Sequence, residues 1–425
     1  HPDPPTGDTT NTDRGEVARV PSSPRIGRDD GMQTAQGAVA IAYDDDHSEP
    51  KARQHQRNGA IDCLRGVVMI LMALDHTRSF LGSTVDLAHA DAAHFFTRWI
   101  THYCAPVFVL LAGTGAWLHG RRLGSTAELS RWLASRGLWL IVVELTFVRA
   151  AWIFYLGPAV VILQVIWAIG ASMVVLAALV WLPLPVLATA AIATIAGHNL
   201  LDGVRADDLG GLRWLWMLLH QQGPVTPFAG ARWFVVYPLI PWFAVMAAGF
   251  ALGPWVILPP EVRRRRFFTL GAALLVGFVL LRASGLYGDP HPWDPARGVL
   301  GFLDGEKYPP SLLFLAMTLG PALVLLALLD RPLGAWGERV TIFGRVPLFY
   351  YVLHILLIHV IAVGLAWPTM GSAALARPYM PNEPLALSLP AVYALWVAVV
   401  VLLYPPSRWF AGVKQRSNAT WLSYV

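Results

Sequence analysis

Ten stretches of about 20 mostly apolar residues occupy the chain from residue 61 onward, and they constrain its fold more than any other feature. A helix of that length matches the hydrocarbon thickness of a bilayer, and within lipid only helices and closed barrels satisfy every backbone polar group. Only 14% of the residues are charged, against roughly 25% in soluble domains. We therefore predict an all-α, polytopic membrane helix bundle with about ten transmembrane helices, at residues 61–80, 100–119, 133–154, 159–181, 184–200, 233–253, 267–285, 311–329, 346–366 and 388–404.

The first 58 residues have a different composition. They are rich in Pro, Gly, Asp, Thr and Ser, and they contain no apolar stretch of the kind found in signal peptides. Such a segment cannot bury enough apolar surface to offset the entropy lost on folding. We predict a disordered N-terminal tail over residues 1–58 and a transmembrane domain over residues 59–425.

Lys and Arg residues are concentrated in every second loop between the predicted helices. Cytoplasmic loops of membrane proteins carry such an excess, so we expect both termini in the cytoplasm and the longer loops outside a cell inner membrane. The net charge of +5 then follows from topology, and we expect membrane lipid rather than nucleic acid as a partner. The cytoplasmic cations would be Lys51, Arg53, Arg57, Arg121, Arg122, Arg131, Arg136, the run 263–266, Arg331, Arg339, Arg345, Arg408, Lys414 and Arg416.

The first predicted helix carries four polar residues in one turn near its outer end: Asp75, His76, Thr77 and Arg78. Ionisable groups within a span are costly and normally face a cavity or a partner. Asp75 and Arg78 share one helix face, and a His next to a carboxylate is suited to act as a base or nucleophile. The pattern indicates either a reactive site or a polar cap at the membrane interface.

A second group of polar residues begins the next predicted helix. His94, Arg98 and His102 are spaced by four residues, so they form one stripe on that helix. We expect this stripe at the same membrane depth as His76. Cys104 could act as a nucleophile, although its apolar surroundings favour a buried structural thiol.

Two features further along the chain add polar groups. His354 lies near the middle of the ninth predicted helix, where it either hydrogen-bonds to a neighbouring helix or contacts a substrate. In the outer loop before the eighth helix, Trp293 could stack on a sugar ring. The spacing of Asp289, His291 and Asp294 matches no metal template, and the two cysteines of the chain suggest no zinc cage, so no metal is expected.

Five motifs occur in the order typical of one known family. The run at 61–72, which contains Asp62 and Arg65, resembles the first core helix of the heparan-alpha-glucosaminide N-acetyltransferase-like transmembrane acyltransferases. Four further stretches are similar to that family, at 105–113, 238–246, 293–301 and 349–354. The resemblance extends over residues 59–425, and the run 75–78 resembles a bacterial branch. It implies a transmembrane acyltransferase-like domain.

The resemblance also implies a reaction. The family moves an acetyl group from cytoplasmic acetyl-CoA to an amino sugar on the far side of the membrane. For this chain the expected acceptor is an amino or hydroxyl group of an envelope glycan or glycolipid on the outer side. The family's reactive His could be His76 or His94 in this chain, acting as general base or as a transient acetyl acceptor, with Asp75 orienting the imidazole. Groups that could stabilise the tetrahedral oxyanion are Arg78, Arg98 and His102.

Binding roles follow from the side of the membrane on which each residue is expected. The residues that would shape the acceptor side are Trp293, Asp294 and His354. The cations that could hold the CoA phosphates are Arg65, Arg121, Arg122 and Arg345.

Two other functions fit the same residues. A transporter or lipid flippase would also place His, Asp and Arg inside a helix bundle, and a non-catalytic scaffold could retain the fold alone. A cationic pocket on the cytoplasmic side would favour the acetyltransferase over the transporter.

Overall fold

The computed structural model describes residues 59–82, 90–376, 385–417, 419 and 422. The tail predicted for residues 1–58 lies outside the described residues. The described part is mostly helical, as predicted. Its α-helices are α1 (Gly59–Leu81), α2 (Ala92–Thr101), α3 (Cys104–Leu123), α4 (Thr126–Val143), α5 (Arg149–Ile153), α6 (Val165–Leu179), α7 (Leu184–Gly197), α8 (Arg213–Leu219), α9 (Leu239–Leu252), α10 (Pro260–Ser284), α11 (Gly298–Leu303), α12 (Leu312–Leu329), α13 (Ala335–Arg345), α14 (Pro347–Met370) and α15 (Leu389–Arg416).

Each of the ten predicted stretches contains at least part of a helix. By length and composition, seven helical segments in the described residues could cross a membrane: Ala92–Leu123, Leu184–Leu201, Leu239–Ile257, Pro260–Ser284, Leu312–Leu329, Pro347–Leu375 and Leu389–Arg416. Helix α1 is long enough as well, but it carries four charged side chains. The number ten and the side of the termini therefore stay predictions.

A small sheet corrects the prediction that the fold is all-α. Strands β1 (Val160–Leu163), β3 (Arg232–Val235) and β2 (Gly223–Val225) pair in that order, with β1 parallel and β2 antiparallel to β3. The predicted helices at 159–181 and 233–253 thus begin as strands, and α6 has only 15 residues. Three consecutive β-branched residues open β1, and such residues pack well on a pleated surface.

Several helix pairs approach each other closely through glycine. A Cβ added at Gly66 would lie 2.1 Å from the Val340 carbonyl oxygen, and one added at Gly344 would lie 1.8 Å from the Asp62 carbonyl oxygen. Small residues allow such contact between membrane helices, so these glycines set the spacing of α1 and α13. The same arrangement joins α3 to α9, α4 to α6 and α10 to α12, through Gly113 and Gly249, Gly137 and Gly170, and Gly271 and Gly320.

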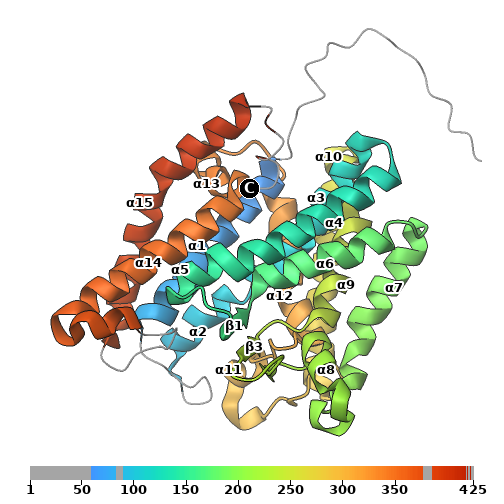
Figure 1. Cartoon of the computed structure of the whole chain (residues 1–425). Coiled ribbons are helices and arrows are strands. Elements are labelled where there is room, and N and C mark those ends of the chain that lie inside the picture. Colours follow the sequence, from blue (N-terminus) through green and yellow to red (C-terminus); the bar gives the residue numbers. More distant parts are fainter. Residues whose placement is uncertain (1–58, 83–89, 377–384, 418, 420–421, 423–425) are drawn as a thin grey trace, which may run out of the picture. The chain divides into compact units, whose positions relative to one another are not determined.

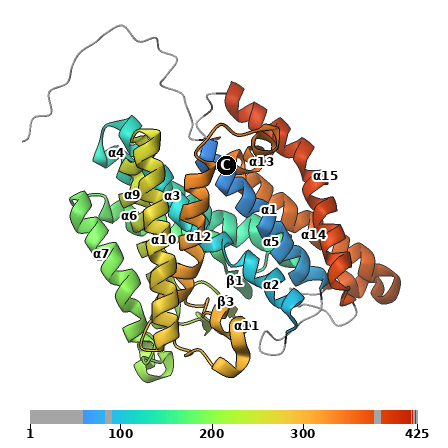
Figure 2. The same ribbon diagram turned by 180° about the vertical axis from the view of Figure 1, so that it is seen from behind.

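Helix α1 is central to one half of the bundle, the half that contains the polar turn at 75–78. It contacts α2, α3, α12, α13, α14 and α15. Figures 1 and 2 show it from opposite sides, with α14 and α15 along one flank and α12 along the other. The polar turn at 75–78 is therefore surrounded by helices from distant parts of the sequence.

Candidate active site

Two histidines from different helices meet near one end of the bundle. His76 Nδ1 on α1 lies 2.6 Å from His354 Nε2 on α14. The two rings are parallel, at 3° and 4.8 Å between centroids, and both are buried. Trp152 on α5 and Tyr351 on α14 contact the edges of His76 at 4.8 and 5.9 Å. We call His76 and His354 the histidine pair.

Hydrogen-bond donors and acceptors fix the tautomers of the pair. His354 Nδ1 lies 2.8 Å from the Tyr350 carbonyl oxygen, which can only accept, so Nδ1 donates. A neutral His354 then has a free lone pair on Nε2, which accepts from His76 Nδ1. His76 consequently keeps its own lone pair on Nε2. This is the state that a general base needs, and it is imposed here by a second imidazole where hydrolase triads use a carboxylate.

The carboxylate expected to orient His76 has other partners. Asp75 Oδ1 accepts from Arg78 Nη2 at 3.0 Å and from Thr101 Oγ1 at 3.0 Å. The bond from Thr101 ties α1 to the end of α2. Asp75 therefore acts on His76 through its charge, while the hydrogen bond that orients the ring comes from His354.

Lys307 reaches the same region from the loop before α12, where no sequence pattern predicted it. Its charge interacts with Asp75, His76, His102 and Arg98. Burial alone would lower the pKa of Lys307, but Tyr308 and Asp75 outweigh it and raise the pKa above the ordinary value. A lone lysine in a proline-rich loop has no pattern from which an inward position could be deduced.

A buried arginine holds that loop in place. Arg282 on α10 donates to the carbonyl oxygens of His291, Gly301, Phe302 and Asp304, at 2.6 to 3.1 Å. Asp289, 3.7 Å from Arg282, accepts from the backbone of His291 and Glu306 and from the Ser311 hydroxyl. These bonds organise the segment 288–311 and so determine where Lys307 lies.

His102 lies at the junction of α2 and α3 and is 4% exposed. Neither of its ring nitrogens has a hydrogen-bond partner among the described residues. Its ring packs against Phe314 at 5.3 Å, and the charges that act on it most strongly are those of Lys307 and Arg98. A buried imidazole without partners can receive a hydrogen bond from a ligand or donate one to it. Cys104, in contrast, donates to the Val68 carbonyl oxygen at 3.5 Å.

Three other predicted residues lie in different settings. His94 binds Asp91, the residue that caps α2, with ring-to-carboxylate distances of 2.9 Å. Trp293 donates to the Gly298 carbonyl oxygen and packs on Phe302. Asp294 caps the turn at Pro295–Arg297. Among the described contacts, none of the three reaches the histidine pair, so their roles in catalysis or acceptor binding stay predictions.

A cavity of about 1550 Å³ opens at the opposite end of α1. Pockets for drug-sized ligands measure roughly 300–1,000 Å³, so this one could hold a larger molecule. Among the described residues, ten Lys and Arg side chains line it against three carboxylates, and we call it the cationic cavity. Its cations are Arg65, Arg122, Arg136, Arg263, Arg264, Arg331, Arg339, Arg345, Arg408 and Lys414. Arg121, which was expected to join them, lies outside the lining.

Much of this positive charge is not neutralised internally. Asp62 pairs with Arg65 at 3.1 Å and Asp330 with Arg263 at 2.6 Å. Arg264 lies 3.9 Å from Glu261. No described carboxylate forms an ion pair with four other lining arginines, Arg122, Arg331, Arg345 and Arg408. Unpaired arginines that converge on a cavity favour a phosphorylated ligand.

Two residues that line the cationic cavity are neighbours of the histidine pair. The lining of the cavity includes Met72, one helical turn before His76, and Tyr351. The Tyr351 ring lies 5.9 Å from His76 and 5.5 Å from His354. A ligand whose charged part lies among the arginines could therefore place its other end against the pair.

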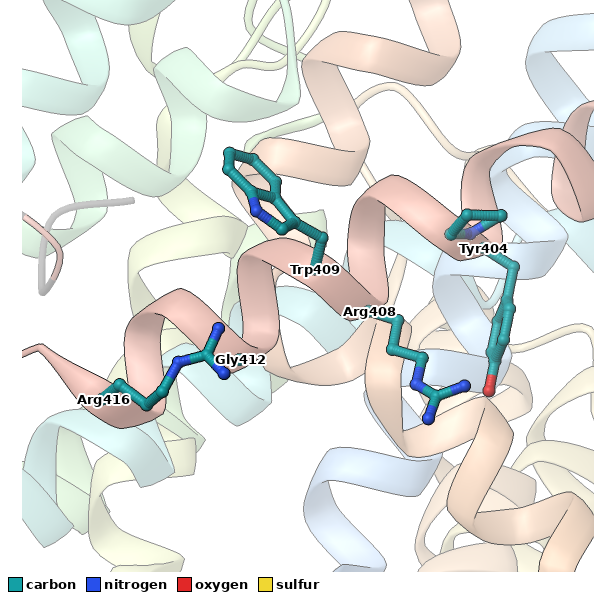
Figure 3. Close-up of a pocket in the computed structure, with 6 residues that line it drawn as sticks. Tyr404, Arg408, Trp409, Gly412 and Arg416 are labelled. Carbon is teal, nitrogen blue, oxygen red and sulfur yellow. The ribbon is translucent and has the colours of Figure 1, made fainter.

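A second, smaller hollow of about 480 Å³ lies along the end of α15. Figure 3 shows Tyr404 and Arg408 extending to one side of this helix and Trp409 to the other. Because Arg408 and Tyr404 also line the cationic cavity, the hollow extends the positive surface at its entrance.

The comparison with protein families agrees with these features. A family model described as heparan-alpha-glucosaminide N-acetyltransferase, catalytic, matches residues 57–281, just over half of the chain. The matched part includes Asp75, His76 and His102, whereas Lys307 and His354 follow it. No curated protein matches the chain significantly. The family match shows that the chain belongs to the heparan-alpha-glucosaminide N-acetyltransferase catalytic family, a family of acetyltransferases.

Proposed function

We propose that this membrane protein transfers an acetyl group from cytoplasmic acetyl-CoA to an amino or hydroxyl group of a glycan or glycolipid on the other side of the membrane. The observation that carries the proposal is that Tyr351 belongs to two unlike regions. It lines the cationic cavity, as Met72 does, and its ring lies 5.9 Å from His76 and 5.5 Å from His354.

The cationic cavity suits the donor by its charge and by its volume. The phosphates of acetyl-CoA would bind among Arg65, Arg122 and Arg345, which line the cavity. Arginine presents several N–H donors in a planar fork, so it binds phosphate oxygens in pairs. The pantetheine arm would then lie along the apolar walls toward Met72 and bring the thioester to Tyr351.

His76 supplies the base. The acceptor amine or hydroxyl loses its proton to His76 Nε2 while its nitrogen or oxygen attacks the thioester carbonyl carbon. A bond forms between the acceptor and the carbonyl carbon, and the carbon–sulfur bond breaks. The proton on His76 then passes to the departing CoA sulfur, which leaves as the free thiol. His354 holds neutral His76 in the tautomer with Nδ1 protonated, and it accepts the Nδ1–H hydrogen bond again when His76 becomes an imidazolium.

Charge develops on the carbonyl oxygen before the sulfur leaves. The charges of Lys307 and Arg98 both act on His102, and the charge of Lys307 also acts on Asp75. These two cations would stabilise the oxyanion. His102 has two unpartnered ring nitrogens and could donate a hydrogen bond to the same oxygen or to the acceptor. Direct transfer requires no acetylated His76, although the same geometry permits one.

The proposal is tested by measuring release of the CoA thiol from acetyl-CoA by the detergent-purified chain, with amino sugars, neutral sugars and lipid-linked glycans as acceptors. We expect release that depends on an acceptor, and an acetylated product by mass spectrometry. His76→Ala should reduce the rate by about 10²- to 10⁴-fold, the usual contribution of a general base. A His291→Gln variant, changed in an exposed loop, is the matched control.

Two outcomes would contradict the proposal. Acetyl-CoA consumption that is equal in wild type and His76→Ala would remove His76 from the mechanism. Movement of a glycolipid across proteoliposomes without any acetyl transfer would favour a transporter.

A further inference from the structure

Three potential metal ligands lie together away from the histidine pair, at the end of α7. His198 belongs to the short 3-10 turn His198–Leu201, Asp202 follows it directly, and His220 follows α8. Both imidazoles are buried, at 2% and 3% exposure, and Asp202 is partly exposed. One potential ligand atom from each of the three side chains lies within 4.8 Å of the other two. No other group of three His, Cys, Asp or Glu side chains converges in this way among the described residues.

The distances suit a tetrahedral ion better than a hydrogen-bonded network. His198 Nδ1 and His220 Nε2 are 3.4 Å apart, which is long for a hydrogen bond between nitrogens. Two nitrogen ligands of tetrahedral zinc, each at 2.0–2.1 Å from the ion, are separated by about 3.4 Å. Asp202 Oδ1 lies 3.9 Å from His220 Nε2, so a small movement of the carboxylate would complete three ligands.

The surroundings already hold the three groups in place. Asn199 Nδ2 donates to Asp202 Oδ2 at 2.8 Å, which leaves Oδ1 directed toward His220. Ligands of protein-bound metals are normally oriented by such outer contacts. The same Asn199 accepts from the backbone of Leu312, the first residue of α12. The three-residue group is therefore linked to the segment that precedes α12 and carries Lys307.

We propose that His198, Asp202 and His220 bind one divalent transition-metal ion, with zinc as the best match, and that water completes its coordination. The ion would join the end of α7 to the segment after α8, in the part of the chain that leads into strand β2. Two histidines and one carboxylate with an open position form a ligand set that zinc accepts. This site was not expected from the sequence, where only Asp289, His291 and Asp294 had been considered.

The site is tested by elemental analysis of the full chain purified in detergent with a non-histidine affinity tag. After dialysis against trace zinc and removal of the excess, we expect about one zinc per chain in wild type. His198→Gln and His220→Gln should each retain less than about one-tenth of that, since two ligands hold zinc weakly. The matched control is His291→Gln, which removes an exposed loop histidine and should keep the wild-type zinc content.

A second measurement keeps the test decisive if the variants fold poorly. Wild-type protein stripped with a chelator is titrated with Co²⁺, and we expect the visible absorption bands of tetrahedral cobalt to saturate at one equivalent. Chelation should lower the midpoint of thermal unfolding of wild type, and added zinc should restore it. Wild type with neither bound zinc nor cobalt bands would overturn the proposal, as would zinc binding that survives both His198→Gln and His220→Gln. Neither result bears on acetyl transfer.

Discussion

The cationic cavity and the histidine pair lie along the same helix, α1, but they differ in width, in burial and in the precision with which their side chains must be placed. The cavity is wide and lined by arginines from six or more segments, many of them partly exposed. The pair is narrow and buried, and it depends on two hydrogen bonds of 2.6 and 2.8 Å. A region that recognises a large polyanion tolerates loose placement, because charge acts over several ångströms. A region that moves one proton does not, because the proton must travel along one short contact.

This contrast predicts that substitutions in the two regions affect different kinetic constants. Changes at the pair should reduce kcat steeply and leave the KM for acetyl-CoA unchanged. Changes in the cavity should raise that KM modestly and add up gradually, since each arginine contributes a part of the total attraction. The predictions below rank from the steepest effect to the weakest.

His354→Phe should have the largest effect. The phenyl ring has a similar size but accepts no hydrogen bond, so His76 loses the partner that fixes its tautomer. We expect kcat for acetyl transfer to fall about 10³-fold, with the KM for acetyl-CoA unchanged. His354→Gln, whose amide oxygen can accept from His76 Nδ1, should recover at least part of the rate. Equal rates in the two variants would mean that the tautomer is not what His354 provides.

Lys307→Gln should come next, because it removes a charge placed to stabilise the oxyanion. We expect a loss of about 10²-fold in kcat. The pKa of Lys307 is raised above its ordinary value of 10.5, so the cation is complete below that pH and is lost only as pH rises through the higher folded value. The ratio of wild-type to variant rates should therefore stay constant from pH 6 to 9. A ratio that falls steadily across this interval would contradict the assignment.

Arg345→Gln should have a smaller effect, on donor affinity. We expect the KM for acetyl-CoA to rise about tenfold, the equivalent of one charge-assisted hydrogen bond, with kcat nearly unchanged. Arg121→Gln is the control, since Arg121 comes from the same set of expected cytoplasmic cations but lies outside the cavity lining. Titration of KM against salt should show a steeper dependence for wild type than for Arg345→Gln. Equal effects of the two substitutions would show that binding depends on net charge alone.

His94→Gln should have the weakest effect. His94 binds Asp91 at the start of α2, and among the described contacts it does not reach the histidine pair. We expect the acetyl transfer rate to change by less than about twofold, as for most surface substitutions. If His94→Gln lowered the acetyl transfer rate as much as His76→Ala in the same assay, His94 rather than His76 would be the base.

The sequence predicted the membrane bundle well because long apolar runs leave a chain few alternatives in lipid. For His76 it left two alternatives, a reactive site or a polar cap at the membrane interface, and the structure places His76 against His354 inside the bundle. The sequence did not predict the strands at Val160–Leu163 and Arg232–Val235, because a short apolar run has no period that separates a strand from a buried helix. These strands form only when the two segments, far apart in the chain, are brought side by side.

Part of the candidate active site was predicted from the sequence, and part of it is seen only in the tertiary structure. The sequence singled out His76, Asp75, His102 and His354 from the cost of placing ionisable groups in a membrane. Only the tertiary structure shows that His76 pairs with His354 and that Asp75 accepts hydrogen bonds from Arg78 and Thr101. It also shows that Lys307 interacts with Asp75. Local composition determines which residues need a partner. Which partner each one finds depends on contacts between segments up to 278 residues apart, and no local pattern encodes such contacts.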